Sequence, residues 1–434
     1  MSTAVLSRQK MPFLPDIKSS EERSSTPEGK SPKSRYRNPL RHNVYVTMLR
    51  QGFHRSFADL YSLMKFWNET RQAAGPDSAL WKARSVEEQP YKLETLQLFL
   101  TRAEAASRAG DHGSVYESQL ALARFFSHPE DKWLSHHFYQ MSLVSARKIK
   151  IDGGKKEAEA NAHIGQVYLE QGQVELAKEH YEAFRHLAAG RTWHDGEGRT
   201  HYSRSCEGLC RVYTLLADRA LQSQEYKTAI QILTKAYEMA KEAGDRQIEG
   251  NAAYRVGLAY QKAGDQLTAK RFLNIYMEIS KILSDANNVG KAYKAIAKSL
   301  ESEDKLTETI QSLEKFAEVS QNSDQQQNLI EAYMSLGMSF NSRGQYDQSC
   351  QYFEQAYETA CALESVPLLH KAQVCLASAR AHRMLRAYII HVEAGGRQSV
   401  QRLISWKESR QDTFNEPAHE LSMLQKGQLD SYTQ

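Results

Sequence analysis

Long apolar runs are missing from this sequence. The 434-residue chain has a mean hydropathy of −0.62, and no uncharged apolar stretch approaches the roughly 18 residues that a membrane-spanning helix needs. The opening residues, MSTAVLSRQKMPFLPDIKSS, also lack the apolar stretch of roughly 7–15 residues found in a secretory signal. We therefore expect no membrane insertion and a reducing compartment.

Cysteine is scarce, odd in number and scattered, which predicts buried free thiols. The five are Cys206, Cys210, Cys350, Cys361 and Cys375. Cys206 and Cys210 lie one helical turn apart and, with His194 and His201, are the one set that suggests zinc. No C-x-x-C pair accompanies them, so the favoured interpretation packs both cysteines in a helix and leaves both histidines in a flexible loop.

An excess of charge of one sign is lacking too. The chain has 56 Lys and Arg against 52 Asp and Glu, a net charge of +4, which is too small for general nucleic-acid binding. Phosphate-binding G-x-x-x-x-G-K-[ST], G-x-S-x-G and H-E-x-x-H motifs are also missing. We expect no catalytic residue, no cofactor and no metal, although an enzyme with an unrecognised site in a helical array remains the rival hypothesis.

Proline is absent between Pro129 and Pro367, while five of the ten prolines fall in the first 40 residues. Because proline interrupts helix interiors, the gap permits long, unbroken helices. Residues 1–41 combine prolines with nine basic and four acidic residues, and a disordered basic tail is expected there. Such a tail suits an anionic surface such as a microtubule, but a solubilising leader is the favoured interpretation.

What the sequence does contain is a 40-residue internal repeat. Small residues recur where the two helices of a hairpin would cross, and bulky apolar residues follow three or four positions later. Two antiparallel helices approach closely only when small side chains face each other at the crossing. These repeat positions are Gly165, Ala177, Ala217, Ala229, Gly257, Ala269, Ala297 and Gly337.

This spacing matches the tetratricopeptide (TPR) pattern, L-G-x-x-Y followed by A-x-x-x-F. It predicts an all-α fold, a superhelical solenoid of antiparallel helix pairs with disordered N- and C-terminal tails, whose first helices line a groove for a segment of another protein. The expected organisation is a tail at 1–41, an N-terminal helical region at 42–117, repeats at 118–190 with the first degenerate, an inserted loop at 191–205, repeats at 206–367, a capping helix at 368–394, and a partly disordered helix and tail at 395–434.

The passage AYEMAKEAGDRQIEGNAAYRVGLAYQKAGD at 236–265 resembles the Leu-Gly-Asn repeat adaptors of spindle orientation. That family clamps its partner with Arg and Asn side chains in the groove. This sequence keeps Gly244-Asp245-Arg246 but has Asn251 at the position of the groove Arg, and Arg255 and Leu258 at the positions of the two Asn. The resemblance implies, as an alternative function, a cytosolic adaptor for spindle-orientation or motor complexes.

Over its full length the chain resembles the axonemal TPR proteins of motile cilia and sperm flagella. The resemblance implies a non-enzymatic scaffold in the cytoplasm and cytoskeleton, at the axoneme of a cilium or flagellum. Axonemal or ciliary-transport proteins would be its partners, and assembly and beating would depend on it.

A groove-facing basic stripe is expected on the first helices. Lys291, Lys294 and Lys298 are spaced three and four apart, so they share one helical face, and an acidic segment would be attracted to that face. A solvated surface is the alternative, since runs of charge usually face water. The expected groove residues are Lys262, Lys291, Lys294, Lys298, Lys371, Asn251 and Tyr254.

Overall fold

The computed structural model describes residues 40–82 and 84–409. The expected basic tail lies outside these residues except for its last two, which begin the first helix, and the expected C-terminal tail lies outside them from residue 410 onward. The chain divides into two compact units, Met1–Gly110 and Asp111–Gln434, which are described separately.

Unit 1 is a small helical assembly. Its elements are α1 (Leu40–Arg50), α2 (His54–Ala74), α3 (Ala79–Lys82), the 3-10 turn η2 (Val86–Glu88) and α4 (Pro90–Arg108). Leu60 and Met64 of α2 meet a core that includes Leu93 and Leu96 of α4. The carboxylate of Glu104 accepts hydrogen bonds from the amide and hydroxyl of Ser56, both at 2.7 Å, and so satisfies the first turn of α2.

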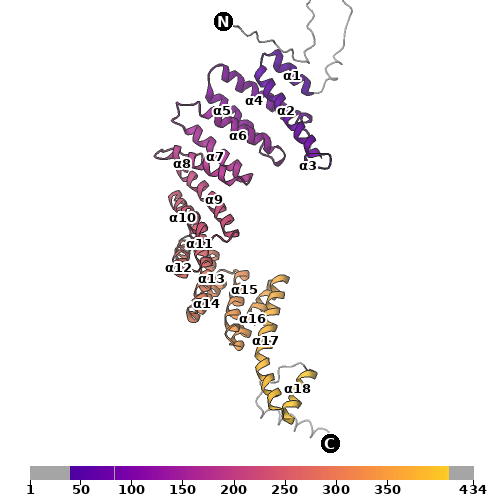
Figure 1. The fold of residues 1–434 in the computed structure, drawn as a ribbon, viewed down its shortest axis with the longest axis vertical. Coiled ribbons are helices and arrows are strands. Elements are labelled where there is room, and N and C mark those ends of the chain that lie inside the picture. Colours follow the sequence, from indigo (N-terminus) through magenta and orange to yellow (C-terminus); the bar gives the residue numbers. More distant parts are fainter. Residues whose placement is uncertain (1–39, 83, 410–434) are drawn as a thin grey trace, which may run out of the picture. The chain divides into compact units, whose positions relative to one another are not determined.

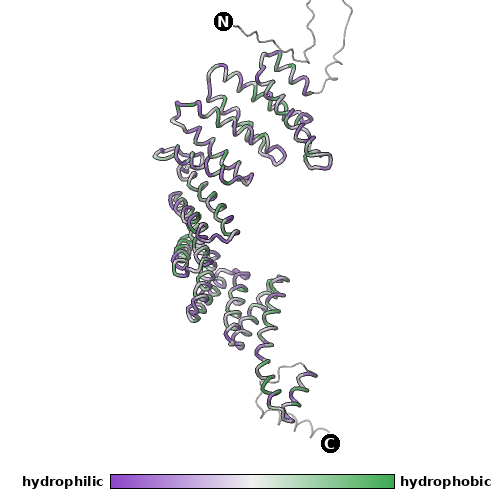
Figure 2. The backbone as a smooth tube through the Cα atoms, viewed as in Figure 1, coloured by the Kyte–Doolittle hydropathy of each residue, from purple (hydrophilic) through white to green (hydrophobic). Residues whose placement is uncertain are grey.

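Unit 2 begins with six consecutive helix pairs (Figure 1), which confirms the predicted TPR-type solenoid. Each helix packs chiefly against its predecessor and its successor. Apolar and polar residues alternate along the helices (Figure 2), as expected for helices that bury one face. The pairs are α5 (His112–Phe125) and α6 (Lys132–Ala146), α7 (Lys155–Glu170) and α8 (Val174–Ala188), α9 (His201–Gln222) and α10 (Tyr226–Ala243), α11 (Arg246–Ala263) and α12 (Gln266–Ile282), α13 (Ala286–Ser302) and α14 (Leu306–Asn322), and α15 (Gln326–Asn341) and α16 (Tyr346–Ala362).

Small residues lie where paired helices cross. A Cβ atom added to Gly257 would sit 2.9 Å from Cγ of Leu273 and 3.3 Å from the carbonyl oxygen of Ala269. One added to Gly337 would sit 2.6 Å from the ring of Phe353. These separations are shorter than van der Waals contact, so the close approach of the helices depends on the missing side chain. The alanines at the other repeat positions, namely Ala177, Ala217, Ala229, Ala269 and Ala297, are all buried.

The turns of unit 2 recur at a spacing that the 40-residue repeat did not reveal. A residue in the left-handed conformation ends a helix every 20 residues from 224 to 364, whether or not it is glycine. Turns within repeats and turns between repeats are therefore built alike, and the repeat consists of two equal halves. These residues are Gln224, Gly244, Gly264, Ser284, Asp304, Asp324, Gly344 and Glu364.

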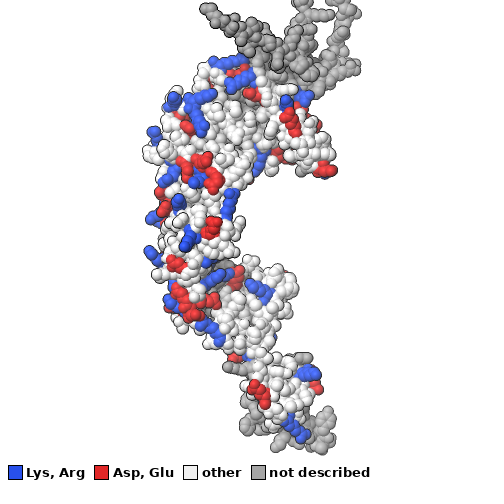
Figure 3. Space-filling view, in the orientation of Figure 1, with Lys and Arg blue, Asp and Glu red and all other residues white. Residues whose placement is uncertain are grey.

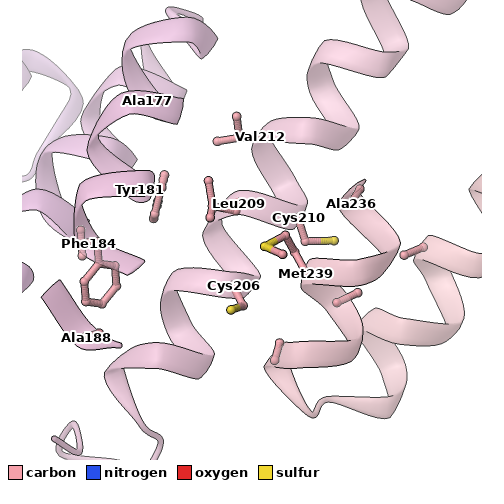
Figure 4. Close-up of a cluster of buried hydrophobic side chains, with 14 of the residues drawn as sticks. Ala177, Tyr181, Phe184, Ala188, Cys206, Leu209, Cys210, Val212, Ala236 and Met239 are labelled. Carbon is pink, nitrogen blue, oxygen red and sulfur yellow. The ribbon is translucent and has the colours of Figure 1, made fainter. Parts of the chain in front are cut away.

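The segment between α8 and α9 interrupts the regular succession of helices, and the 20-residue spacing holds only after it, since Gly154, Gly172 and Gly190, which precede it or lie at its start, are 18 residues apart. In it His194 and Thr200 form an isolated β-bridge, and Gly196, Glu197 and Gly198 are exposed. The expected loop at 191–205 ends earlier, because the hydroxyl of Thr200 accepts a hydrogen bond from the amide of Ser203 and starts α9 at His201. The interruption leaves packing intact: a buried cluster joins α7, α8, α9, α10 and α11, and its central part is shown in Figure 4.

Two further boundaries differ from the expected ones. The expected boundary at 117 and 118 falls inside α5, whose first turn is capped by Asp111 through a 3.0 Å hydrogen bond from the amide of Ser114. After the pairs, α17 (Val366–Ala394) packs on α16, and α18 (Arg397–Ser409) packs on α17. Within the described residues, no helix has the length and apolar character needed to cross a bilayer.

Candidate partner-binding surface

Each first helix of unit 2 keeps one face exposed. Its other faces contact its own second helix and, from α7 onward, the preceding second helix, and successive first helices from α7 to α17 also contact each other. Five positions 40 residues apart, one on each of α9, α11, α13, α15 and α17, are all exposed. We call the exposed face of these five helices the first-helix surface. The residues at these five positions are Arg211, Asn251, Lys291, Glu331 and Lys371.

All five expected lysines are exposed, but their surroundings differ. The ammonium group of Lys294 lies 2.6 Å from the carboxylate of Glu331 on α15. Lys291 is 3.5 Å from the side-chain oxygen of Asn288. Among the residues that the structure describes, Lys262 and Lys298 have no hydrogen-bond or ion-pair partner.

The structure brings Lys262 and Lys298 to neighbouring turns. The side-chain amide of Gln261 donates to the carbonyl of Ala295 at 3.0 Å and to the hydroxyl of Ser299 at 2.8 Å. The turn of α11 that carries Lys262 is thereby held beside the turn of α13 that carries Lys298. Lys371 lies apart from this group, because α15 intervenes between α13 and α17.

Asn251 and Tyr254 occupy different environments on α11. Asn251 is exposed. Tyr254 is partly buried against the ring of Tyr276, with centroids 4.7 Å apart, and burial raises the pKa of its hydroxyl. Tyr254 therefore packs α11 against α12, and only part of its side chain remains for a partner.

Ion pairs between successive first helices are the feature that the sequence interpretation missed. Arg255 of α11 contacts Asp218 of α9 at 2.8 Å, and Lys294 pairs with Glu331. Both pairs join residues 37 positions apart, so a search for opposite charges at this spacing would have found them. Blue and red atoms lie close together over parts of the face shown in Figure 3.

Three of the four residues considered for zinc, His201, Cys206 and Cys210, are buried, whereas His194 is exposed. His201 is 1% exposed in α9, and its Nε2 lies 3.1 Å from Glu159, so the expectation that it belongs to a flexible loop is wrong. The thiol of Cys206 lies 3.7 Å from the carboxylate of Glu242, and burial raises its pKa. In the described part of the chain, no three His, Cys, Asp or Glu residues are grouped as metal ligands.

The remaining cysteines do not all follow the expectation of burial. Cys350 is buried and Cys375 is partly buried, whereas Cys361 is exposed. Cys361 falls one turn after Tyr357 near the end of α16.

A cavity of about 550 Å³ opens between α8, α9 and α10. Several of its polar groups have partners: Arg185 and Tyr202 of the lining both donate at 2.7 Å to Glu242, which lies beside the cavity, and Tyr213 donates to Glu182 at 3.2 Å. The hydrogen bond from Tyr202 lowers the pKa of Glu242, so its carboxylate stays ionised. An ionised Glu242 has no proton to donate as a general acid. The Cys206 thiol, whose pKa is raised by burial, is not an activated nucleophile.

Comparison with known proteins places the chain in a family. The family profile described as tetratricopeptide repeat matches residues 158–184 and 330–360. Tetratricopeptide repeat protein 29 of Macaca fascicularis is 44% identical over 385 residues, which cover 89% of this chain and 81% of that protein. The human protein of the same name is 42% identical over the same length and the same shares. The chain belongs to the tetratricopeptide repeat protein 29 family.

More distant members of the tetratricopeptide repeat protein 29 family are also similar. The protein of Trypanosoma brucei brucei is 21% identical over 295 residues, 68% of this chain and 60% of that protein. Among solved structures, BtubC from P. vanneervenii is 14% identical, covers 53% of this chain and 91% of its own, and gives a TM-score of 0.38. The match to tetratricopeptide repeat protein 29 covers 89% of the chain, and the repeats are typical of protein-interaction scaffolds.

Proposed function

We propose that this chain is a non-enzymatic scaffold of the axoneme, and that assembly and beating of motile cilia and sperm flagella depend on it. Its first-helix surface would hold an acidic segment of an axonemal or ciliary-transport protein. Family membership, together with the resemblance to axonemal TPR proteins described in the sequence analysis, supports the location. The observation that carries the binding mode is the juxtaposition of Lys262 and Lys298, which are exposed and lack an internal acidic partner.

Charge placement supports an acidic partner. Lys262, Lys291 and Lys298 retain exposed ammonium groups on adjoining helices, whereas Lys294 and Arg255 are each matched by a carboxylate. Exposed charges at the edge of an interface mainly set the association rate and its dependence on salt. We therefore expect binding to weaken as ionic strength rises.

The test compares two charge-reversal variants of the full chain. In the surface variant, Lys262, Lys291 and Lys298 are changed to Glu. The matched control changes three exposed lysines of second helices to Glu: Lys227, Lys241 and Lys315. Immobilised wild-type and control chains should retain acidic proteins from an axonemal extract in low salt, and the surface variant should retain them at least about tenfold less. Equal retention by both variants would refute the binding mode.

The location needs its own experiment. Proximity labelling by the tagged full chain in a ciliated, dividing cell should mark axonemal proteins. Enrichment of spindle-orientation proteins instead would favour the adaptor alternative. The motif that suggested this alternative has a local role: Asp245 accepts hydrogen bonds from the amides of Gln247 and Ile248, and Arg246 pairs with Glu249.

The proposal also excludes catalysis at the cavity between α8 and α10. Arg185, Tyr202, Tyr213 and Glu182 of its lining are held by hydrogen bonds to one another or to the ionised carboxylate of Glu242. Enzymatic sites instead tend to carry groups whose pKa values are shifted towards the operating pH. The surface variant changes no residue that lines this cavity, so the loss of partner binding expected from it would not involve the cavity.

A further inference from the structure

Unit 1 contains a cleft that the proposed function does not use. The cleft has a volume of about 320 Å³ and lies where α1 and α2 meet η2. Tyr45 and Tyr61 line it, Met64 also borders it, and Arg41 and Glu87 contribute an ion pair at 2.5 Å.

An aromatic wall forms one side of this cleft. The ring of Phe57 lies 5.4 Å from that of Tyr45 and 6.1 Å from that of Tyr61, and the two tyrosine rings are 6.4 Å apart. The wall is incompletely covered, because Tyr61 is 52% exposed. Exposed tyrosine rings held in a fixed arrangement are the surface on which proline-containing segments in the polyproline II conformation bind.

A hydrogen-bond donor accompanies the rings. Burial, together with the nearby charge of Glu87, raises the pKa of Tyr45 to about 12, so its hydroxyl keeps its proton over the physiological range. A polyproline II segment makes no internal hydrogen bonds and leaves its carbonyl groups free to accept.

The chain itself supplies a segment of this chemistry. Met11-Pro12-Phe13-Leu14-Pro15 is the longest apolar stretch in the first 39 residues and has two prolines spaced three apart. Lysines flank it at positions 10 and 18, and the cleft carries the exposed carboxylate of Glu69, which lies 3.8 Å from the ammonium group of Lys65. The segment and the cleft that suits it therefore belong to the same chain.

The point of attachment favours this segment over one from another protein. Residues 1–39 join the described chain at Leu40, the first residue of α1, and Arg41 and Tyr45 of the same helix line the cleft. Residues 16–39, at up to about 3.3–3.6 Å each, are long enough to lead from Pro15 to Leu40. A segment tethered so closely has an effective concentration of about millimolar, so even weak docking is populated.

We propose that Met11–Pro15 docks in the cleft of unit 1, with its proline rings on Tyr45 and Tyr61. The docked segment covers the exposed ring of Tyr61, and any outside protein that uses this cleft must first displace it.

The test uses full-length chains and a labelled peptide of residues 8–18. A variant with Pro12→Ala, Phe13→Ala and Pro15→Ala would leave the cleft vacant, so it should bind the added peptide at least tenfold more tightly than the wild type in fluorescence anisotropy. Adding Tyr61→Ala should abolish that binding. Adding Tyr91→Ala, which removes another exposed tyrosine of unit 1 outside the cleft, should leave it unchanged.

A second measurement does not depend on the folding of the Tyr61→Ala chain. Nitration of Tyr61 by tetranitromethane, followed by mass spectrometry, should be slow in the wild type and fast in the Pro12→Ala, Phe13→Ala, Pro15→Ala chain. Equal nitration in these two chains would overturn the proposal. Equal peptide binding by the two chains would also overturn it. Failure of the triple variant to bind the peptide would overturn it as well and would leave the cleft to a segment of another protein.

Discussion

At the scale of single residues, small side chains decide how closely the helices approach. The glycine at 208 on α9 leaves room for the ring of Tyr181, where a Cβ atom would overlap it, and Gly337 does the same for Phe353. Because the obstructing groups are rings and backbone atoms inside a packed core, they have little freedom to move away.

Gly257→Leu should lower the free energy of unfolding by roughly 1–3 kcal/mol or more. The added side chain meets Leu273 and the backbone of Ala269, so α11 and α12 must separate. Urea unfolding followed by circular dichroism measures the effect. Gly196→Leu is the control, because nothing lies within 4 Å of its Cβ position. If both substitutions lowered the free energy of unfolding equally, the close approach of α11 and α12 would not depend on the glycine at 257.

His163 makes the stability of unit 2 depend on pH. Burial, aided by Arg124 and Arg204, lowers its pKa to about 4, and its ring stacks on Tyr139 at 5.1 Å. The unfolded chain therefore takes up the proton first as the pH falls. The stability contributed by neutral His163 is complete above about pH 6.5 and is lost between about pH 6.5 and 4, by about 3 kcal/mol in total.

Removing the imidazole should remove most of this dependence. The His163→Phe chain keeps an aromatic ring against Tyr139, so its free energy of unfolding should change less between pH 7 and pH 4.5 than that of the wild type. His128→Phe, at an exposed position, should retain the wild-type slope. An unchanged slope in His163→Phe would show that other groups carry the acid sensitivity.

At the scale of helices, the turns explain where each element ends. Five of the residues in the left-handed conformation are not glycine, among them Gln224 with a φ of 61°. Side chains with a Cβ atom are strained there, and glycine is not. The non-glycine turns therefore carry a conformational strain energy that the turns at Gly244, Gly264 and Gly344 avoid.

Gln224→Gly should therefore raise the free energy of unfolding by about 0.5–1 kcal/mol. Ser223→Gly, one residue earlier at a φ of −81°, should lower it, because glycine there only adds freedom to the unfolded chain. The two chains can be compared by urea unfolding. A loss of stability in Gln224→Gly would mean that the glutamine side chain stabilises the turn more than its conformation strains it.

The sequence predicted the helical pairs well and the surface less well. Periodic small and bulky residues such as Gly257 and Leu273 encode packing directly, because each contact is local to a repeat. The pairing of Lys294 with Glu331 depends on how one first helix lies against the next, and charge alone does not reveal it. The start of α9 at His201 was missed because a cap by Thr200 outweighs the loop-like composition that precedes it.

At the scale of unit 2, the equal spacing of the turns makes the repeats interchangeable. Ser284 and Asp324 are both in the left-handed conformation, 40 residues apart. Deleting 285–324 joins Ser284 to Gln325 and places α15 where α13 had been. Since repeat arrays are held by contacts between neighbours, the shortened array should remain folded.

We expect the chain without 285–324 to keep its helicity per residue and a cooperative, less stable unfolding transition. Deleting 285–304 alone brings two second helices into succession and mismatches the small residues at their crossing, so helicity per residue should fall. Circular dichroism and sedimentation distinguish these results. Equal loss of structure in both deletions would show that the 40-residue unit is not interchangeable.

The segment between α8 and α9 interrupts the regular succession of helices without dividing the core. Apolar side chains on both sides of it, including Phe184 and Leu209, belong to one buried cluster, while Gly196 to Gly198 stand exposed. A protease that cuts there would sever the polypeptide but leave its two fragments held together, so nicked protein should elute at the volume of the intact chain and come apart only in denaturant.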